Sequence, residues 1–256
     1  RVRRQRQMCI RDRDIYAITP QNEPLFVPPN YPGMEMLADE QATFVAKYLK
    51  PLFNDNNIRT KILGYDHNWD RIDYPLEILD KAEAAFDGIA WHWYGGNVIN
   101  QSRVALFYPD KEIHFTEGSG GDWIPAFEPA FSNLMRTGIN IFRNGAKSMT
   151  LWNLALDENN GPTVPGFGKS TCRGLVKVDQ QTKNYELTLD YFGLAHFSKF
   201  VRPESVRIES SNDRHIQSVA FQNNNKSIVV ILFNDSEKDA SVKITIDTYS
   251  MDTIYL

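Results

Sequence analysis

The feature that most constrains the fold is an alternation of short β-branched runs with longer amphipathic stretches, from residue 14 to about residue 200. Five consecutive units of this kind predict parallel strands joined by crossover helices. The expected strands are residues 14–19, 60–65, 88–93, 112–116 and 148–152. The expected helices, from apolar residues at helical spacing, are 34–53, 75–86, a segment within 100–108, 126–144 and 188–200.

Two architectures are compatible with this pattern, an open doubly wound sheet and a (β/α)8 barrel. A doubly wound dinucleotide-binding fold carries a glycine fingerprint after its first strand, and none follows residues 14–19. The barrel is therefore the expected fold. Because five units do not close an eight-stranded barrel, we expect residues 14–202 to form strands four to eight, with the first strands missing.

The pattern changes near residue 203. Short strands are expected at 205–210, 216–222, 227–233 and 241–246, separated by turns rich in asparagine, aspartate and serine. A last strand near 253–256 ends abruptly, so residues 203–256 are expected to form an antiparallel β-sandwich domain or part of one. The predicted fold class is thus α/β, the C-terminal part of a TIM barrel followed by an antiparallel β-sandwich.

Residues 1–13 are set apart by their charge. They hold six arginines and one aspartate, whereas the remaining 243 residues carry 22 basic and 31 acidic groups. A basic arm is typical of nucleic-acid binding, but this one lacks apolar periodicity and adjoins an acidic body that would repel phosphate. We therefore expect a non-native arm, similar to translated sequencing-adaptor DNA, and no nucleic-acid partner.

The sequence offers no sign of a cofactor, a metal or an obligate protein partner. It has no glycine-rich phosphate loop and no histidine cluster at metal-ligand spacing. Its two cysteines, Cys9 and Cys172, are too far apart for a CxxC pair, and Cys172 is expected to be a spectator thiol. No run of about 18 apolar residues occurs, so no membrane span is expected.

Polar and aromatic residues follow the expected strands. In a barrel, catalytic groups lie at these C-terminal strand ends. The relevant sequences are QNEP at 21–24, HWYGG at 92–96, TEGSG at 116–120 and LWN at 151–153. Their convergence predicts a substrate site at this end of the barrel.

Glu23 and Glu117 are the candidate catalytic pair. Retaining glycoside hydrolysis needs two carboxyl groups about 5–5.5 Å apart. About three βα units separate these glutamates, so we expect them to face each other across the barrel mouth. A single glutamate on a loop is usually only solvated, but that interpretation is less satisfactory for two glutamates at strand ends.

Several neighbouring residues have two possible roles. Trp93, Tyr94 and Trp152 are either core aromatics or surfaces that stack on a sugar ring. His92 is either a packing histidine or part of the site, and Tyr94 is the better candidate for contacting a carboxylate. His67, expected just after the second strand, either contacts the sugar or forms a structural turn.

At these residues the sequence resembles glycoside hydrolase family 30, which contains glucosylceramidases and endo-β-1,6-glucanases. The likeness runs from about residue 14 to residue 203 and more weakly beyond. By this resemblance, TPQNEP assigns the acid/base role to Glu23 and a contact with the sugar 2-hydroxyl to Asn22. FTEGSG assigns the nucleophile to Glu117, HWY places Tyr94 beside it, and LWNLALD makes Trp152 the platform under the sugar.

The resemblance implies a secreted or periplasmic retaining enzyme that acts on a β-glucan or β-glucoside. GYDHNWD at 64–70 and DKEIHFTEGSG at 110–120 are more like the β-1,6-glucanases, whereas HWY is more like the glucosylceramidases. We favour a β-1,6-glucanase and keep a glucosylceramidase-type β-glucosidase as the alternative. A catalytically inactive carbohydrate-binding barrel is less favoured because both carboxylates are present. The family's first three strands, its N-terminal sandwich strands and any signal peptide are expected to be missing.

Overall fold

The computed structural model describes residues 15–122, 130–163, 165–166, 168–246 and 249–255. The expected non-native arm, residues 1–13, lies outside the described residues, as do residues 126–129 of an expected helix. The chain divides into two compact units, residues 1–118 with 144–150, and residues 119–143 with 151–256. The domain boundary near residue 203 stays a prediction. None of the described helices is long and apolar enough to cross a membrane.

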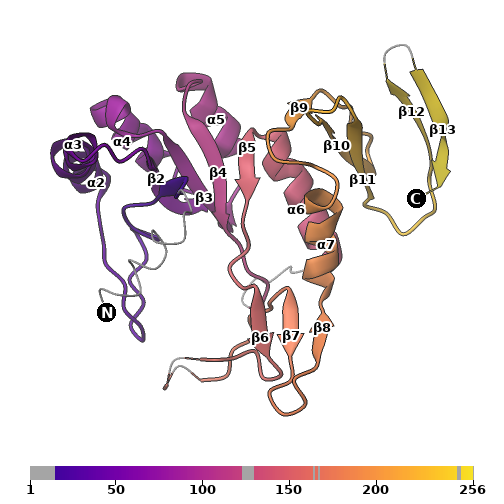
Figure 1. Cartoon of the computed structure of the whole chain (residues 1–256), viewed down its shortest axis with the longest axis horizontal. Coiled ribbons are helices and arrows are strands. Elements are labelled where there is room, and N and C mark those ends of the chain that lie inside the picture. Colours follow the sequence, from indigo (N-terminus) through magenta and orange to yellow (C-terminus); the bar gives the residue numbers. More distant parts are fainter. Residues whose placement is uncertain (1–14, 123–129, 164, 167, 247–248, 256) are drawn as a thin grey trace. The chain divides into compact units, whose positions relative to one another are not determined.

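A five-stranded sheet forms the centre of the first unit (Figure 1). Its strands pair in sequence order, and every pairing is parallel, as predicted. They are β1 (Ala17–Ile18), β2 (Lys61–Trp69), β3 (Gly88–Gly96), β4 (Glu112–Glu117) and β5 (Ala146–Met149). The first and last strands are shorter than expected, while β2 continues four residues beyond the expected end.

Helices connect these strands, as the apolar spacing predicts. They are α2 (Ala38–Phe44), α3 (Lys50–Asp55), α4 (Asp73–Ala82) and α5 (Ile99–Phe107). The single helix expected at 34–53 is instead α2 and α3 joined by a π-helical turn, Val45–Leu49. Pro51 explains the interruption, because its ring nitrogen cannot donate to a carbonyl in the preceding turn.

Close packing joins α4 to β2. A Cβ atom on Gly64 would lie 2.3 Å from Cδ1 of Ile78, so a larger residue would require the Ile78 side chain to move. Ile78 and the neighbouring Phe86 are almost completely buried. The tight contact holds β2, which carries several polar residues at its carboxyl end.

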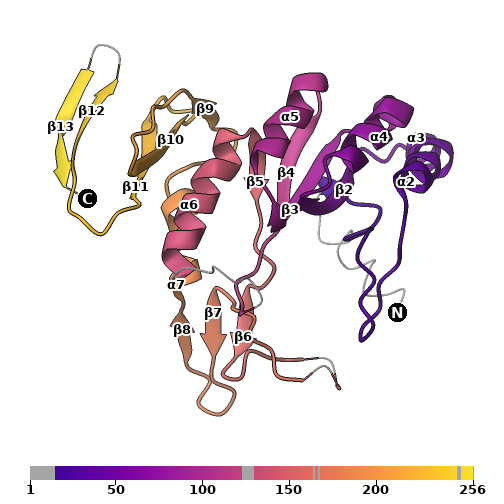
Figure 2. The same cartoon turned by 180° about the vertical axis from the view of Figure 1, so that it is seen from behind.

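The described residues of the second unit form α-helices and small sheets, which Figure 2 shows from behind. The helices are α6 (Ala130–Arg143) and α7 (Leu189–Ser198). One antiparallel sheet contains β9 (Val206–Ile208), β10 (Ile216–Gln222) and β11 (Ile228–Asn234), and β12 (Ser241–Ile246) pairs with β13 (Tyr249–Tyr255). These strands agree with those expected after residue 203.

A third small sheet in this unit was not predicted. It consists of β6 (Ala155–Asp157), β7 (Val176–Val178) and β8 (Tyr185–Leu187). Each strand has only three residues and is flanked by polar loops. Such runs are too short for the alternation that identifies a strand in a sequence.

Two arginines of α6 attach that helix to the antiparallel sheet. Arg136 forms a bidentate ion pair with Asp235 at the end of β11, with N–O distances of 2.8 and 2.5 Å. Arg143 donates to the carbonyl oxygens of Ser210 and Ser218, each at 2.9 Å. The guanidinium groups of Arg136 and Arg143 therefore hold α6 against polar groups next to the strands of the sheet.

A cluster of charged groups lies at the start of β4. Glu112 accepts hydrogen bonds from Lys61 on β2 at 2.7 Å, from Lys147 on β5 at 2.8 Å and from Tyr16 at 2.8 Å. Burial alone would raise the pKa of Glu112, but these donors and His114 outweigh it and lower the pKa to about 2. One carboxylate thus connects three strands at the amino end of the sheet.

We expect Glu112→Gln to lower the free energy of unfolding at pH 7 by about 1–3 kcal/mol, since charged hydrogen bonds are lost. The folded pKa is depressed, so the stabilisation is present above the ordinary value of 4.5 and is lost as the pH falls toward 2. Denaturant unfolding at pH 7, 5 and 3.5 should show the difference between wild type and variant shrinking. Glu186→Gln, at an exposed position, is the control, and a difference independent of pH would contradict the prediction.

Candidate active site

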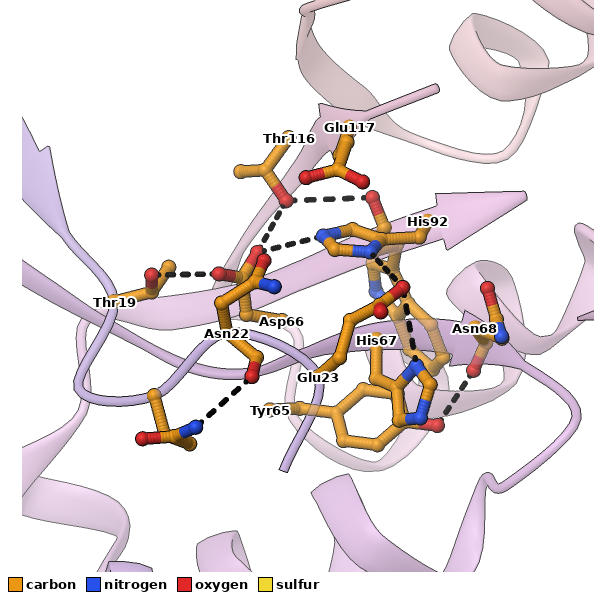
Figure 3. A network of polar contacts seen from close by, with 12 residues as sticks. Thr19, Asn22, Glu23, Tyr65, Asp66, His67, Asn68, His92, Thr116 and Glu117 are labelled. Carbon is orange, nitrogen blue, oxygen red and sulfur yellow. Dashed lines mark hydrogen bonds and ion pairs between the residues drawn. The ribbon is translucent and has the colours of Figure 1, made fainter. Parts of the chain in front are cut away.

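The candidate site lies at the carboxyl ends of β1 to β4 (Figure 3). Glu23 lies in the turn after β1, and Asp66 lies within β2. His92 comes from β3, and Glu117 is the last residue of β4. All four belong to the first compact unit. The structure therefore brings the two glutamates predicted from the sequence to the carboxyl end of one parallel sheet.

Two register shifts determine which side chains face this site. Between β2 and β3, Tyr65 pairs with Ala90 and His67 with Trp91, so Asp66 is an extra residue. Successive residues of a regular strand point to opposite faces. The bulge breaks this alternation. Asp66 therefore contacts His92, and the next residue, His67, lies near Glu23 in the same site.

The second shift lies between β3 and β4. Trp91 pairs with Phe115 and His92 with Glu117, which leaves Thr116 as the extra residue. The Thr116 hydroxyl donates to Asp66 at 2.6 Å, while Glu117 accepts from Tyr94. Neighbouring residues of β4 therefore both contribute to the site.

The backbone of the first bulge is strained and held by a side chain from α2. Tyr65 and Asp66 have φ angles of 73° and 60°, which non-glycine residues seldom adopt. The Tyr65 N–H donates to the side-chain oxygen of Gln41, at 2.8 Å, and the Gln41 residue is fully buried. This acceptor satisfies a buried N–H that the irregular ladder leaves available.

Glu23 is positioned through its own backbone and its carboxylate. It too has a positive φ, 46°, and its N–H donates to the carbonyl oxygen of Asp66 at 3.0 Å. Oε1 of Glu23 lies 3.2 Å from Nδ1 of His92 and 3.9 Å from Nδ1 of His67. Among the described residues, these three side chains present donor atoms within 4.8 Å of one another, the grouping best suited to a metal ion.

Asp66 and His92 form a buried charge pair. Asp66 accepts from Thr19 at 2.6 Å, from Thr116 and from His92, whose Nε2 is 3.0 Å away. Burial alone would raise the pKa of Asp66, but these hydrogen bonds lower it overall. For His92, burial acts to lower the pKa, and hydrogen bonds to Asp66 and Glu23 outweigh it and raise the pKa to about 9. His92 is therefore an imidazolium that donates to a carboxylate on each side.

Glu117 has a different environment. Its Oε1 accepts from the Tyr94 hydroxyl at 3.1 Å. Burial raises the pKa of Glu117, the His92 cation opposes this, and the negative charge of Glu23 adds to the rise. Each glutamate thus contacts a side chain of β3, Glu23 the His92 imidazole and Glu117 the Tyr94 hydroxyl.

The other predicted site residues are placed as follows. Asn22 lies in the turn beside Glu23, and His67 lies inside β2, 8% exposed, rather than after it. Trp93 packs on the Phe115 ring, with centroids 5.5 Å apart, and against Gly118. Trp152 belongs to the second compact unit and is 56% exposed. Contacts of these residues with substrate stay predictions.

Several residues of the site were missed by sequence reasoning. Asp66, Thr19 and Thr116 form the polar centre. Burial raises the pKa of Tyr31, and the negative charges of Glu23 and Glu117 add to the rise. One signal was available, because an aspartate directly after the residues ILGY of an expected buried strand must be paired if it is buried too. The two threonines carried no comparable signal.

Comparison with known proteins identifies the last part of the chain first. Residues 204–254 match the model of the glycosyl hydrolase family 30 beta sandwich domain. The chain is 31% identical over 238 residues to the endo-1,6-beta-D-glucanase neg1 of Aspergillus fumigatus, covering 90% of this chain and 47% of that protein. The predicted resemblance to glycoside hydrolase family 30 is confirmed. The chain spans about half the length of the curated relatives it matches.

Solved structures confirm the predicted fold class. The endo-beta1,6-glucanase BT3312 superimposes with a TM-score of 0.88 and 31% identity, covering 100% of this chain and 59% of that one. The parallel sheet is thus part of a TIM barrel, and a separate antiparallel sheet follows it. The lysosomal acid glucosylceramidase of Mus musculus is more distant, at 26% identity over 90% of this chain and 48% of that protein.

We expect Gln41→Leu to lower the free energy of unfolding by about 1–3 kcal/mol, because the buried Tyr65 N–H loses its acceptor. Denaturant unfolding at neutral pH measures the change. Gln180→Leu, at an exposed position, makes the same chemical change where no buried group depends on it. Equal stability of the two variants would show that Gln41 does not support the bulge.

Proposed function

We propose that the protein containing this chain is a retaining β-glycosidase that cleaves β-1,6-glucan. The observation that carries the proposal is the placement of Glu23 after β1 and Glu117 at the end of β4, at the same end of one parallel sheet, each in contact with a side chain of β3. Two carboxyl groups in such an arrangement are the chemical requirement for double displacement. Likeness to endo-1,6-β-glucanases supports the choice of substrate.

In the first step Glu117 attacks the anomeric carbon, and the protonated Glu23 gives its proton to the departing glycosidic oxygen. The Tyr94 hydroxyl orients the attacking carboxylate through its hydrogen bond to Oε1. In the second step Glu23, which is ionised once it has given up its proton, removes a proton from the water that releases the sugar.

His92 positions Glu23 during both steps. The hydrogen bond between Nε2 of His92 and Asp66 fixes the orientation of the imidazole ring. Nδ1 of the ring is therefore held in a position facing the Glu23 carboxylate. A positioned donor of this kind lowers the freedom of the acid/base carboxylate without taking part in bond cleavage. In this proposal Asn22 binds the sugar 2-hydroxyl, and His67, His92, Trp93, Tyr94 and Trp152 line the substrate site.

The substrate is assigned by relative likeness. Identity is 31% with the Aspergillus fumigatus endo-1,6-β-glucanase and 26% with the mouse glucosylceramidase over the same share of the chain. A glucosylceramidase-type activity is therefore the second candidate. The proposal also includes secretion or periplasmic export and a glycan as the binding partner. It places the start of a sandwich domain near residue 203, which the match over residues 204–254 supports.

Glu117→Ala in the full-length protein should reduce turnover of an aryl β-glycoside at least about a thousandfold, because no group remains to form the glycosyl-enzyme. Azide should restore part of the activity and give a glycosyl azide of inverted, α configuration. Glu77→Ala, an exposed glutamate of α4, is the control and should keep wild-type turnover. Unchanged turnover in Glu117→Ala would refute the assignment.

The matching variant Glu23→Ala separates the two roles. It should lose about 10²–10⁴-fold on glucan, where the leaving group needs a proton, and much less in the first step with an activated aryl leaving group. Azide should now give the retained, β-configured glycosyl azide, because the covalent intermediate still forms. Interchanged azide products would show that the two roles are reversed.

We expect the full-length protein to release β-1,6-linked glucose oligomers from β-1,6-glucan and to show at least tenfold lower kcat/KM on glucosylceramide. Product analysis by chromatography, together with initial rates on both substrates, measures this difference. A β-1,3-glucan of equal chain length is the control for linkage. Preference for glucosylceramide would favour the second candidate and overturn the glucanase assignment.

A further inference from the structure

Three donor atoms converge beside β1, β2 and β3. They are Oε1 of Glu23, Nδ1 of His67 and Nδ1 of His92, all within 4.8 Å of one another. The distances from the Glu23 oxygen to the two nitrogens are 3.2 and 3.9 Å. Ligands of a tetrahedral zinc ion, with bonds of 2.0–2.2 Å, lie about 3.3 Å apart. Small side-chain movements would therefore bring the three atoms around one ion.

The Nδ1 atom of His67 has no hydrogen-bond partner among the described residues. Nδ1 is buried, the residue is 8% exposed, and no hydrogen bond reaches this atom in the described part of the chain. A buried polar atom without a partner is uncommon in folded proteins. The atom instead faces the Glu23 carboxylate, as Figure 3 shows.

His92 already has the support that metal-binding histidines usually have. Its Nε2 donates to Asp66 at 3.0 Å, which leaves Nδ1 directed toward Glu23. Metal ligands commonly donate their second ring N–H to a carboxylate in this way. Asp66 is fixed in turn by the hydroxyls of Thr19 and Thr116. The outer groups of a zinc site are thus in place.

We propose that Glu23, His67 and His92 form an inhibitory binding site for a Zn²⁺ ion. Two imidazoles and one carboxylate suit zinc and leave a fourth position for water. Mg²⁺ prefers oxygen ligands and fits this donor set poorly. The negative charges of Asp66 and Glu117 close by add attraction for a divalent cation.

Zinc binding replaces a proton by a metal ion. The proton that His92 shares with Glu23 leaves to solvent, and the nitrogen and oxygen coordinate the ion instead. Glu23 can then neither donate nor accept a proton, so turnover stops. This consequence rests on the proposed acid/base role of Glu23, whereas the binding of zinc does not.

The test measures binding and inhibition separately on the full-length protein. Calorimetric titration with Zn²⁺ at pH 7.5 should give one site, and visible absorption of bound Co²⁺ should show tetrahedral coordination. Zn²⁺ should inhibit hydrolysis of an aryl β-glycoside, with reversal by a chelator. Mg²⁺ should neither bind at this site nor inhibit.

Variants locate the site. His67→Phe keeps the ring packing on Tyr65 and should weaken Zn²⁺ binding at least about a hundredfold, with the same shift in the concentration for half-inhibition of its own activity. Glu23→Gln, the second variant, should also lose binding, because an amide is a poor zinc ligand. His114→Gln removes a buried histidine that pairs with Glu112 and should bind zinc as tightly as wild type.

Each outcome decides one question. No stoichiometric zinc binding to the wild type, or equal affinity in wild type and in folded His67→Phe or Glu23→Gln, overturns the zinc site. Zinc binding that is lost in both variants, in a protein without glycosidase activity, keeps the site and refutes the proposed function. Binding without inhibition of an active enzyme keeps the coordination and overturns the inhibitory role.

Discussion

The buried carboxylate of Asp66 is the group on which the rest of the candidate site depends. A charge at 5% exposure is stable only if it is paired and hydrogen-bonded, and here two threonine hydroxyls and an imidazolium satisfy it. The partners come from the end of β1, from β3 and from β4. One charge therefore fixes the relative positions of neighbouring strand ends, and its backbone carbonyl holds Glu23 as well.

The Asp66 carboxylate contacts its partners because the sheet has register shifts at Asp66 itself and at Thr116. The extra residue in β2 turns Asp66 and His67 toward one group, and the extra residue in β4 does the same for Thr116 and Glu117. Bulges often change the direction of side chains next to active sites. The strained backbone costs free energy, which the buried hydrogen bond from the Tyr65 N–H to Gln41 and the packing of the sheet offset.

The arrangement gives two glutamates with different surroundings. Glu23 accepts from a cationic imidazole, whereas Glu117 accepts from a neutral phenol and burial raises its pKa. A double displacement needs an ionised nucleophile, and the His92 cation and the Tyr94 hydroxyl both favour that form of Glu117. The opposite end of the sheet serves stability, where Glu112 connects three strands through lysine and tyrosine donors.

The sequence by itself determined the order of strands and helices and the position of both glutamates at strand ends. The apolar runs of buried parallel strands and the turn-rich sandwich are local patterns, so they are readable without coordinates. Only the tertiary structure decided that Asp66 is the centre, that β2 continues through a bulge to Trp69, and that three-residue strands form a further sheet. It also brought His67 and His92 to one carboxylate, although no metal-ligand spacing exists in the sequence. These features depend on contacts between residues far apart in the chain and on a register shift of one residue, and neither leaves a periodic trace in the sequence.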